Sequence, residues 1–475
     1  MKKKYLSIGA YLLFSTILLI GCQKKEKVEI KNNFEKTKKN VEKNSVHRKG
    51  IEHIADYQKQ IRKGIYEEKS AYENGYLIKE YNKAKKQKLA RKSTSAITPV
   101  FTERGPNNVP GRSRGIAIDP NNSNRWFIGT VGGGIWRTEN AGSTWTNLTD
   151  FKMPNLSTST IVMSQTNSNV LYVGTGEPFG NLGNIGGAGV FKTTNGGSSW
   201  QSLAGTAAFG DIGRMIINPS NDSNVLIATS SGIYRTTNGG SSWLQTYNSA
   251  GNRVQDLDAD PSNFNIQYGS VNGLGIVKST DGGVTWSTAL NTANYNANHS
   301  RFEMDVSSVD PSVLVVCAYS SSGGTVSPTT DLYVSKNGGT TFTNLTAPAG
   351  AIVDRLDLVG GQGWYDNIVL AHPYNQNVFY VGGVELFKVT INNDNSFTAL
   401  EMAATNQNSN LVQKNTNVHV DQHGLKVIKG ANNTFRIVLA NDGGVFLSNS
   451  DTDPGVDEGD WSNSCLLYTS PSPRD

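Results

Sequence analysis

The sequence predicts an all-β protein, a β-propeller of four-stranded blades, from three observations. A motif of a hydroxyl residue, Asn or Asp two positions later, glycine and a closing aromatic recurs five times. Its aromatic residues fall 55, 43, 43 and 56 positions apart, which is a repeat length typical of solenoids and propellers. Between the motifs, short β-branched and aromatic runs alternate with Gly, Pro, Asn and Ser, which indicates strands joined by turns.

The first repeat shows the expected strands of one blade. They lie at 115–119, 125–130, 135–138 and 145–148, and similar runs follow in the next repeats. Four strands in roughly 43 residues make one propeller blade. Two further units, 368–383 with the following LFKV and 423–448, keep the same order of runs without a clean motif. The sequence therefore predicts about seven visible blades.

The five repeat motifs are predicted to be structural. An Asx side chain accepts hydrogen bonds from its own turn, and glycine supplies positive φ. The closing aromatic is expected to cover the edge between neighbouring blades. The residues concerned are Asn140 and Trp145, Asn195 and Trp200, Asn238 and Trp243, Asp281 and Trp286, and Asn337 and Phe342. These residues resemble the Asp-box or BNR repeat of sialidases, xyloglucanases and sortilin-type receptors.

Residues 1–22 have a basic start, an apolar run and a final Leu-Ile-Gly-Cys, which predicts a secretory signal. This end resembles the lipobox of bacterial lipoproteins, which implies lipidation of Cys22 and a lipid partner. Gln23 follows the cysteine. The family rule for inner-membrane retention expects Asp there, so the resemblance implies an outer-membrane lipoprotein, periplasmic or exposed at the cell surface.

The charge is divided between two parts of the chain. Residues 23–92 hold 21 Lys and Arg against 10 Asp and Glu, whereas residues 93–475 hold 20 against 29. The basic part predicts a partly helical or disordered tether over 23–98. The lysines are not interspersed with aromatic residues and belong to no known nucleic-acid-binding motif. Because the following part of the chain is also acidic, nucleic-acid binding is not expected.

The other end of the chain predicts a truncation. Residues 465–475, CLLYTSPSPRD, resemble a sequencing adapter translated in frame. We therefore expect the propeller to occupy 99–464 and to be incomplete and unclosed. Cys465 then becomes foreign, Cys22 is lipidated and Cys317 stands alone in an apolar strand, so no disulfide is expected.

Polar residues cluster where the innermost strand of each blade is expected to begin. Such residues meet at one mouth of a propeller, where ligand sites gather. They are Arg112, Arg114, Arg214, Arg253 and Arg301, then Trp364, Tyr365 and Asp366, then His419, Asp421 and His423, with Glu177 and Phe179 from a long loop. Arginine suits bidentate recognition of carboxylates, and aromatic rings suit stacking on sugars.

Each of these clusters also has a structural interpretation. An arginine at a strand start can pair with a carboxylate of the neighbouring blade. His419, Asp421 and His423 alternate along one expected strand and would point to one side. They could hold a divalent metal ion as a cofactor, or they could form a structural hydrogen-bond network. No other cofactor is expected.

The enzyme resemblances are incomplete. The segment before the first motif lacks the Arg-Ile-Pro motif of sialidases, and Val131 stands where xyloglucanase-type propellers carry a catalytic Asp. Most of 100–464 resembles secreted Bacteroidetes-type proteins labelled glycosyl hydrolase or sortilin-like. We therefore expect a monomeric, surface-tethered propeller that binds a glycan, peptide or partner protein. The alternative is a glycoside hydrolase with Asp366, Asp421 and Glu177 as acid–base residues, because such hydrolysis needs two carboxylates.

Overall fold

The computed structural model describes residues 76–90, 111–150, 152–181, 185–321, 329–347, 358–403, 415 and 417–465. The chain divides into two compact units, and the one that begins at Ala71 holds all of these residues. Cys22, the predicted signal and most of the predicted tether lie outside the described residues. Within that tether, α3 (Tyr76–Ala90) is a helix of 15 residues. Among the described helices, none has the length and apolar character needed to cross a membrane.

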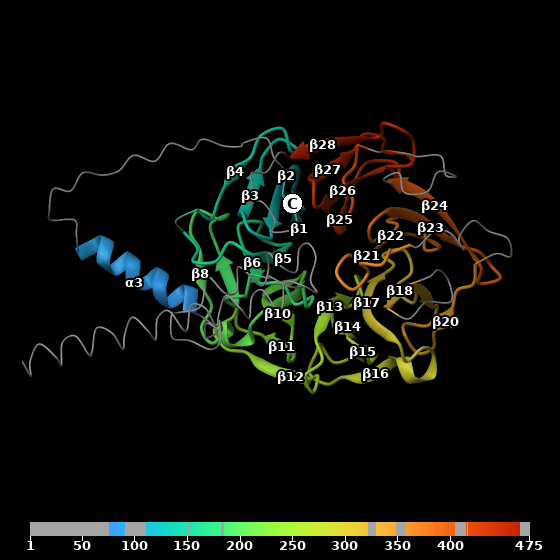
Figure 1. Ribbon diagram of the computed structural model, residues 1–475, viewed down its shortest axis with the longest axis horizontal. Helices are drawn as coiled ribbons and strands as arrows, with labels where there is room; N and C mark the ends of the chain where they lie inside the picture. The colour runs from blue at the N-terminus through green and yellow to red at the C-terminus, as the bar shows by residue number, and fades with distance from the viewer. Residues whose placement is uncertain are drawn as a thin grey trace, which may run out of the picture. The chain divides into compact units, whose positions relative to one another are not determined.

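Seven four-stranded antiparallel sheets follow, arranged as blades around an axis (Figure 1). The first holds β1 (Ser113–Asp119), β2 (Asn122–Thr130), β3 (Gly134–Thr138) and β4 (Thr146–Asn147). The second holds β5 (Thr158–Met163), β6 (Leu171–Thr175), β7 (Val190–Thr193) and β8 (Gln201–Ser202). The third holds β9 (Ile212–Asn218), β10 (Asn221–Thr229), β11 (Gly232–Thr236) and β12 (Leu244–Asn248), preceded by the short helix η2 (Thr206–Phe209).

The remaining four blades repeat this order. The fourth holds β13 (Val254–Ala259), β14 (Gln267–Val271), β15 (Gly275–Ser279) and β16 (Ser287–Asn291), followed by η3 (Thr292–Asn294). The fifth holds β17 (His299–Val306), β18 (Leu314–Ser320), β19 (Thr330–Ser335) and β20 (Thr343–Asn344). The sixth holds β21 (Ile368–Ala371), β22 (Val378–Gly382), β23 (Leu386–Ile391) and β24 (Phe397–Ala403). The seventh holds β25 (Gln422–Lys429), β26 (Phe435–Asn441), β27 (Gly444–Ser448) and β28 (Trp461–Cys465). The predicted seven-bladed propeller is confirmed.

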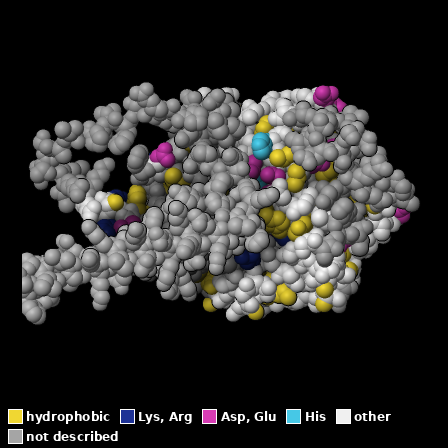
Figure 2. All heavy atoms as spheres, in the orientation of Figure 1, with side chains coloured by type: hydrophobic (Ala, Val, Ile, Leu, Met, Phe, Trp, Pro, Cys, Tyr) yellow, Lys and Arg dark blue, Asp and Glu magenta, His cyan; other side chains and the backbone are white. Residues whose placement is uncertain are grey.

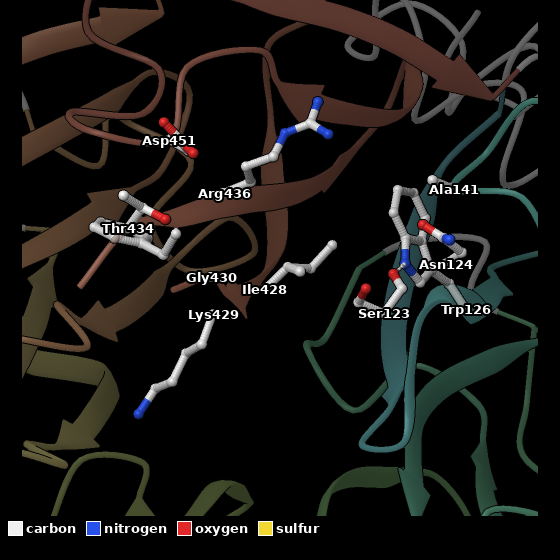
Figure 3. A pocket seen from close by; sticks show the side chains of 11 residues that line it. Ser123, Asn124, Trp126, Ala141, Ile428, Lys429, Gly430, Thr434, Arg436 and Asp451 are labelled. Carbon is white, nitrogen blue, oxygen red and sulfur yellow. Dashed lines mark hydrogen bonds between the residues drawn. The ribbon is translucent and has the colours of Figure 1, made fainter. Parts of the chain in front are cut away.

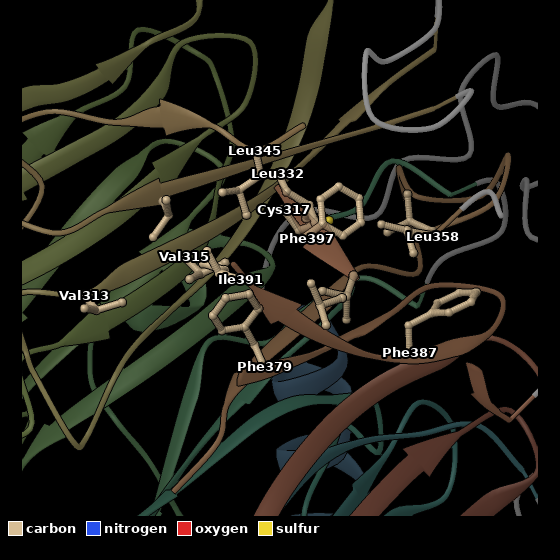
Figure 4. Packing of buried hydrophobic residues seen from close by; sticks show 14 of the residues in the cluster. Val313, Val315, Cys317, Leu332, Leu345, Leu358, Phe379, Phe387, Ile391 and Phe397 are labelled. Atoms are coloured by element: carbon tan, nitrogen blue, oxygen red, sulfur yellow. The ribbon is translucent and has the colours of Figure 1, made fainter. Parts of the chain in front are cut away.

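The hydrophobic core lies between the blades. Each sheet is covered on both faces, so its second strand is largely buried, as β18 is in every residue. Seven buried clusters fill the seven boundaries between blades. Figure 4 shows the cluster between the fifth and sixth blades, where Cys317 and Leu332 pack beside Phe379 and Phe397. Cys317 is a buried free thiol in this core.

The five repeat motifs form hydrogen-bonded turns between the third and fourth strands of the first five blades. In the first, Asn140 Oδ1 accepts from Thr138 Oγ1 and from the Thr144 amide, both at 2.9 Å. Asn195, Asn238, Asp281 and Asn337 accept the corresponding bonds in their own turns. The closing aromatics reach the preceding blade, as where Trp200 Nε1 donates to Leu148 O at 3.2 Å.

The ring closes between the seventh and first blades. Ile116, Trp126 and Ile128 pack against Val438 and Ala440 in one buried cluster. Trp145 Nε1 donates to the carbonyl oxygen of Ser464 at 2.8 Å. The expectation of an unclosed ring is therefore wrong for the described residues, whereas the truncation at the C-terminal end stays a prediction. The short segment β28 supplies the fourth strand of the seventh blade, and four residues of pairing are enough to complete it.

Candidate functional site

The candidate site lies where the inner strands begin. The inner strands β1, β5, β9, β13, β17, β21 and β25 contact one another in a ring. Residues just before or at their starts therefore meet around the axis, together with the loop after β6. Figure 2 shows acidic, basic, histidine and hydrophobic side chains near the middle of the face seen, where the atoms are not grey. We call the buried polar side chains at this end of the axis the central network.

Arg112, Asp442 and His423 form the middle of the central network. The Arg112 guanidinium donates from Nε to Asp442 Oδ1 at 2.5 Å and from Nη2 to Oδ2 at 2.6 Å. His423 Nε2 lies 2.6 Å from Asp442 Oδ1. Burial raises the pKa of Asp442, but these two partners outweigh burial and hold the pKa well below its usual value. Asp442 is therefore a permanent carboxylate that joins the first blade to the seventh.

Tyr365 extends the network to the second blade. Arg112 Nη1 donates to the Tyr365 hydroxyl at 2.9 Å, and that hydroxyl donates to Glu177 Oε1 at 2.5 Å. Asn181 Nδ2 donates to the other oxygen of Glu177 at 3.1 Å. Only 3% of Glu177 is exposed. Residues of four blades are thus connected by side chains alone.

Asp366 is a buried carboxyl group that has no hydrogen-bond partner among the described residues. It is 0% exposed, and its Oδ1 lies 3.2 Å from His423 Nδ1, outside hydrogen-bond geometry. Burial, followed by the charges of Asp421 and Asp442, raises its pKa well above the ordinary value. Burial and the charge of Arg114 lower the pKa of His423. Both shifts favour the neutral form of the group, and in neutral His423 a proton on Nε2 would face Asp442.

The ring of Phe179 lies close to two buried arginines. The Arg114 guanidinium carbon lies 4.2 Å from the centre of the Phe179 ring, and that of Arg301 lies 4.6 Å from it. Arg114 also lies 4.5 Å from the centre of the Tyr365 ring. The ring faces replace part of the hydration that these cations lose on burial. Nε and Nη2 of Arg114 have no hydrogen-bond partner.

A second set of ion pairs connects the third, fourth and fifth blades. Arg214 donates to Asp256 Oδ1 and to Glu303 Oε2, both at 2.8 Å. Arg301 donates to the other oxygen of Glu303 at 2.7 Å. Arg301 also donates to the carbonyl oxygens of Tyr365 and, at 3.0 Å, Asn367. Arg301 therefore positions the segment that carries Tyr365 and Asp366.

Carboxylates also complete the free edges of the inner strands. Asp256 accepts from the Met304 amide at 3.0 Å, Asp258 from Val306 at 2.7 Å, and Asp305 from Ala371 at 2.6 Å. Inner strands of neighbouring blades do not pair, so their amides need such acceptors. Burial and Glu303 raise the pKa of Asp256 to about 7, although Arg214 opposes them. Burial likewise raises the pKa of Asp258 and Asp305.

We expect Asp256 to contribute stability that is lost as the pH rises from about 4 to about 8. A carboxyl group with a raised pKa binds its proton more tightly in the folded protein. The resulting stability is present at or below the unfolded pKa of about 3.9 and is lost as the pH rises through the folded pKa. For Asp256 the folded pKa is about 7. Urea unfolding at pH 5 and pH 8 measures the difference. Relative to Asp256→Asn, the wild type should lose stability between pH 5 and pH 8, and an identical pH dependence of the two proteins would contradict the expectation.

The structure brings some predicted site residues together and leaves others apart. Arg114, Glu177, Tyr365, Asp366 and His423 belong to the central network, and Arg214 and Arg301 adjoin it. Four others lie outside: Arg253 and His419 are exposed, and Trp364 and Asp421 are half-buried.

The expected strand through 419–423 begins only at Gln422. Asp421 has φ +65, so the chain turns there, and His419, Asp421 and His423 do not share one side of a strand. Gln362 donates to Asp421 at 3.2 Å. Among the described residues, no group of three His, Cys, Asp or Glu side chains is placed to hold a metal ion.

Sequence reasoning missed the acidic partners of the arginines. Asp442 lies in an Asn-Asp-Gly-Gly turn between β26 and β27. This sequence is typical of any tight turn and gives no sign of a partner for Arg112. Asp256 and Asp258, and Glu303 and Asp305, alternate with apolar residues along β13 and β17. Carboxylates at alternate positions of an inner strand are the signal that could have found them, because such positions share one side.

The central network is suited to holding blades together more than to reacting with a substrate. Glu177 and Asp366 are buried and covered by their neighbours. Along the axis, a cavity of about 60 Å³ is lined by residues of β1, β5, β9 and β25, including Arg114, Arg214 and Lys426. At about 30 Å³ per water molecule, this cavity holds about two waters and no sugar ring.

Comparison with known proteins finds similar folds and one weak sequence relative. No protein-family model matches the chain. A probable oligoxyloglucan-reducing end-specific xyloglucanase of Neosartorya fischeri is 27% identical over 103 residues, which are 21% of this chain and 12% of that protein.

Two crystal structures of GH74 enzymes are similar to the propeller. An ancestral GH74 enzyme has a TM-score of 0.57 at 18% identity, covering 79% of this chain and 49% of its own. The GH74 enzyme of Niastella koreensis has a TM-score of 0.54 at 20% identity, covering 74% and 54%. The chain thus spans about half the length of these solved proteins. At such identities the likeness shows the fold: a seven-bladed propeller of the kind found in GH74 enzymes.

Proposed function

We propose that this chain is a glycan-binding β-propeller that recognises its ligand at the end of the axis where the inner strands begin, without hydrolysing it. The burial of Glu177 and Asp366 carries this proposal. Glycoside hydrolysis needs two carboxyl groups that reach opposite sides of a glycosidic bond. Both of these side chains instead contact protein groups on all sides, with 3% and 0% exposure.

Exposed groups around the central network supply the binding surface. Trp364 is half-buried and packs at 5.5 Å from the Tyr365 ring, and Arg253 and His419 are exposed. An aromatic face with nearby polar side chains matches the apolar and hydroxyl faces of a sugar. The xyloglucanase relative supports a glycan as the ligand class. We further propose that Cys22 is lipidated and holds the propeller at the outer membrane.

A glycoside hydrolase is the second candidate, favoured by the GH74-like fold and by the weak xyloglucanase relative. In that case Asp366, with its raised pKa, is the group suited to act as the acid. A movement of the segment that carries Tyr365 would have to expose it.

We expect xyloglucan oligosaccharides to bind the full-length chain without the appearance of new reducing ends. Isothermal titration calorimetry measures the affinity, and chromatography of the incubated oligosaccharides measures cleavage. Trp364→Ala should weaken binding about tenfold, because stacking on one ring contributes about 1–1.5 kcal/mol. Circular dichroism checks its folding. Cleavage that disappears in Asp366→Asn would replace this proposal by the second candidate.

A further inference from the structure

A cleft lies between the seventh and first blades, at the end of the blades opposite to the central network. It has a volume of about 210 Å³ and is lined by residues at the turn between β25 and β26 and at the start of β2. None of its lining residues belongs to the central network. Figure 3 shows Arg436 and Asp451 on the side of the seventh blade and Asn124, Trp126 and Ala141 on the side of the first, with Ile428 between them.

Arg436 is the cation of this cleft. Its Nε donates to the carbonyl oxygen of Ser448 at 2.6 Å, which fixes the guanidinium. Among the described residues, neither terminal nitrogen of Arg436 has a hydrogen-bond partner. Burial lowers the pKa of Arg436 by more than the charges of Asp460 and Asp451 raise it, so an anionic partner at the guanidinium would offset the desolvation cost that remains. Two terminal N–H groups held in one plane match the two oxygens of a carboxylate.

Lys429 lines the same cleft but does not contribute its charge to it. Its ammonium lies 5.5 Å from the centre of the Tyr374 ring, and Figure 3 shows the side chain extending away from Arg436 and Trp126. Asp460, the other acid that acts on Arg436, is engaged elsewhere, because its carboxylate accepts from the amides of Ser450 and Gly455.

Asp451 decides which anion the cleft suits. Its charge acts on Arg436, yet the two side chains form no ion pair. A bare anion placed at Arg436 would be repelled by this carboxylate. A ligand with hydroxyl groups beside its own carboxylate would instead donate to Asp451 while it accepts from Arg436.

The other walls complete the match to a sugar ring. Trp126, Ala141 and Ile428 offer an apolar surface, and Ser123, Asn124 and Thr434 offer neutral polar groups. Neutral partners of this kind pair with hydroxyls. The cleft volume of about 210 Å³ suits one monosaccharide unit and is too small for a drug-sized ligand. We propose that this interblade cleft binds the carboxylate-bearing residue of an acidic sugar, a uronic acid, with Arg436 on the carboxylate and Asp451 on a hydroxyl.

The test uses the full-length chain with glucuronate, glucose, acetate and alanine as separate probes, and saturation-transfer NMR titration as the readout. Glucuronate should bind in the millimolar range, and each other probe at least tenfold more weakly. Arg436→Gln should weaken glucuronate binding at least tenfold. The matched control, Lys429→Gln, removes a cation from the same cleft and should change the affinity less than twofold.

Three results would overturn the assignment. Glucose that binds as well as glucuronate would remove the role of the carboxylate. Alanine that binds more tightly would assign the cleft to amino acids, and an unchanged affinity in Arg436→Gln would place the ligand elsewhere. The surface proposed for oligosaccharides does not enter this test, because Trp364→Ala should leave glucuronate binding unchanged although it weakens oligosaccharide binding.

Discussion

Replacing Asp442 by Ala is expected to lower the free energy of unfolding by about 3–5 kcal/mol, because a buried ion pair that loses one partner leaves an uncompensated charge. Asp442 accepts two bonds from Arg112 and one from His423. The side chains of Arg112 and Asp442 are 7% and 9% exposed, so water cannot replace the lost partner. Urea unfolding at pH 7 measures the change.

The size of this effect should depend on burial and not on pairing alone. Lys388 and Asp453 also lie 2.5 Å apart, but half of the Asp453 side chain is exposed. Asp453→Ala should therefore cost less than about 1 kcal/mol. If Asp442→Ala and Asp453→Ala destabilise equally, the central network does not hold the first and seventh blades together as described.

The blades could be predicted because each is a local pattern. Strand, turn, strand and motif follow one another within about 43 residues, and the structure places β1 at Ser113–Asp119 where the sequence indicates 115–119. Propeller blades bury both sheet faces, so even their second strands stand out as apolar runs. The same repetition predicted which residues open the inner strands, and therefore which side chains meet near the axis.

The partners of these side chains could not be predicted. Arg112 and Asp442 are 330 positions apart, and Tyr365 and Glu177 are 188 apart. Such pairs depend on how far each blade is rotated and on which rotamer fills the axis, and neither follows from a local pattern. The closure of the ring was mispredicted for a related reason, because β28 is short and carries no motif of its own.

The prediction that His419, Asp421 and His423 share one side of a strand was wrong because of the backbone conformation of Asp421. Alternation places residues on one side only within a continuous strand. Asp421 has a left-handed backbone conformation, which Asp adopts more readily than most residues, and this turn separates His419 from His423. As a result, His423 is buried at the start of β25, whereas His419, before the turn, is exposed.

Arg301→Met is expected to lower the free energy of unfolding by about 3–5 kcal/mol and to loosen the segment before β21. The substitution removes one of the two partners of Glu303 and leaves the carbonyl oxygens of Tyr365 and Asn367 without their donor. Buried acceptors without partners cost about 1–3 kcal/mol each. The exposed Arg253 supplies the control, since its side chain makes no hydrogen bond to the described part of the chain and Arg253→Met should change stability little.

Hydrogen exchange distinguishes a local role of Arg301 from a general loss of stability. If Arg301 positions the segment, amides at 365–371 should lose protection more than those of β10 or β26, which lie in other blades. Uniform loss in all blades would show that Arg301 acts only through the core. Because Trp364 adjoins this segment, a local loss should also weaken oligosaccharide binding, and the same arginine would then connect the packing of the fifth blade to the surface proposed for the ligand.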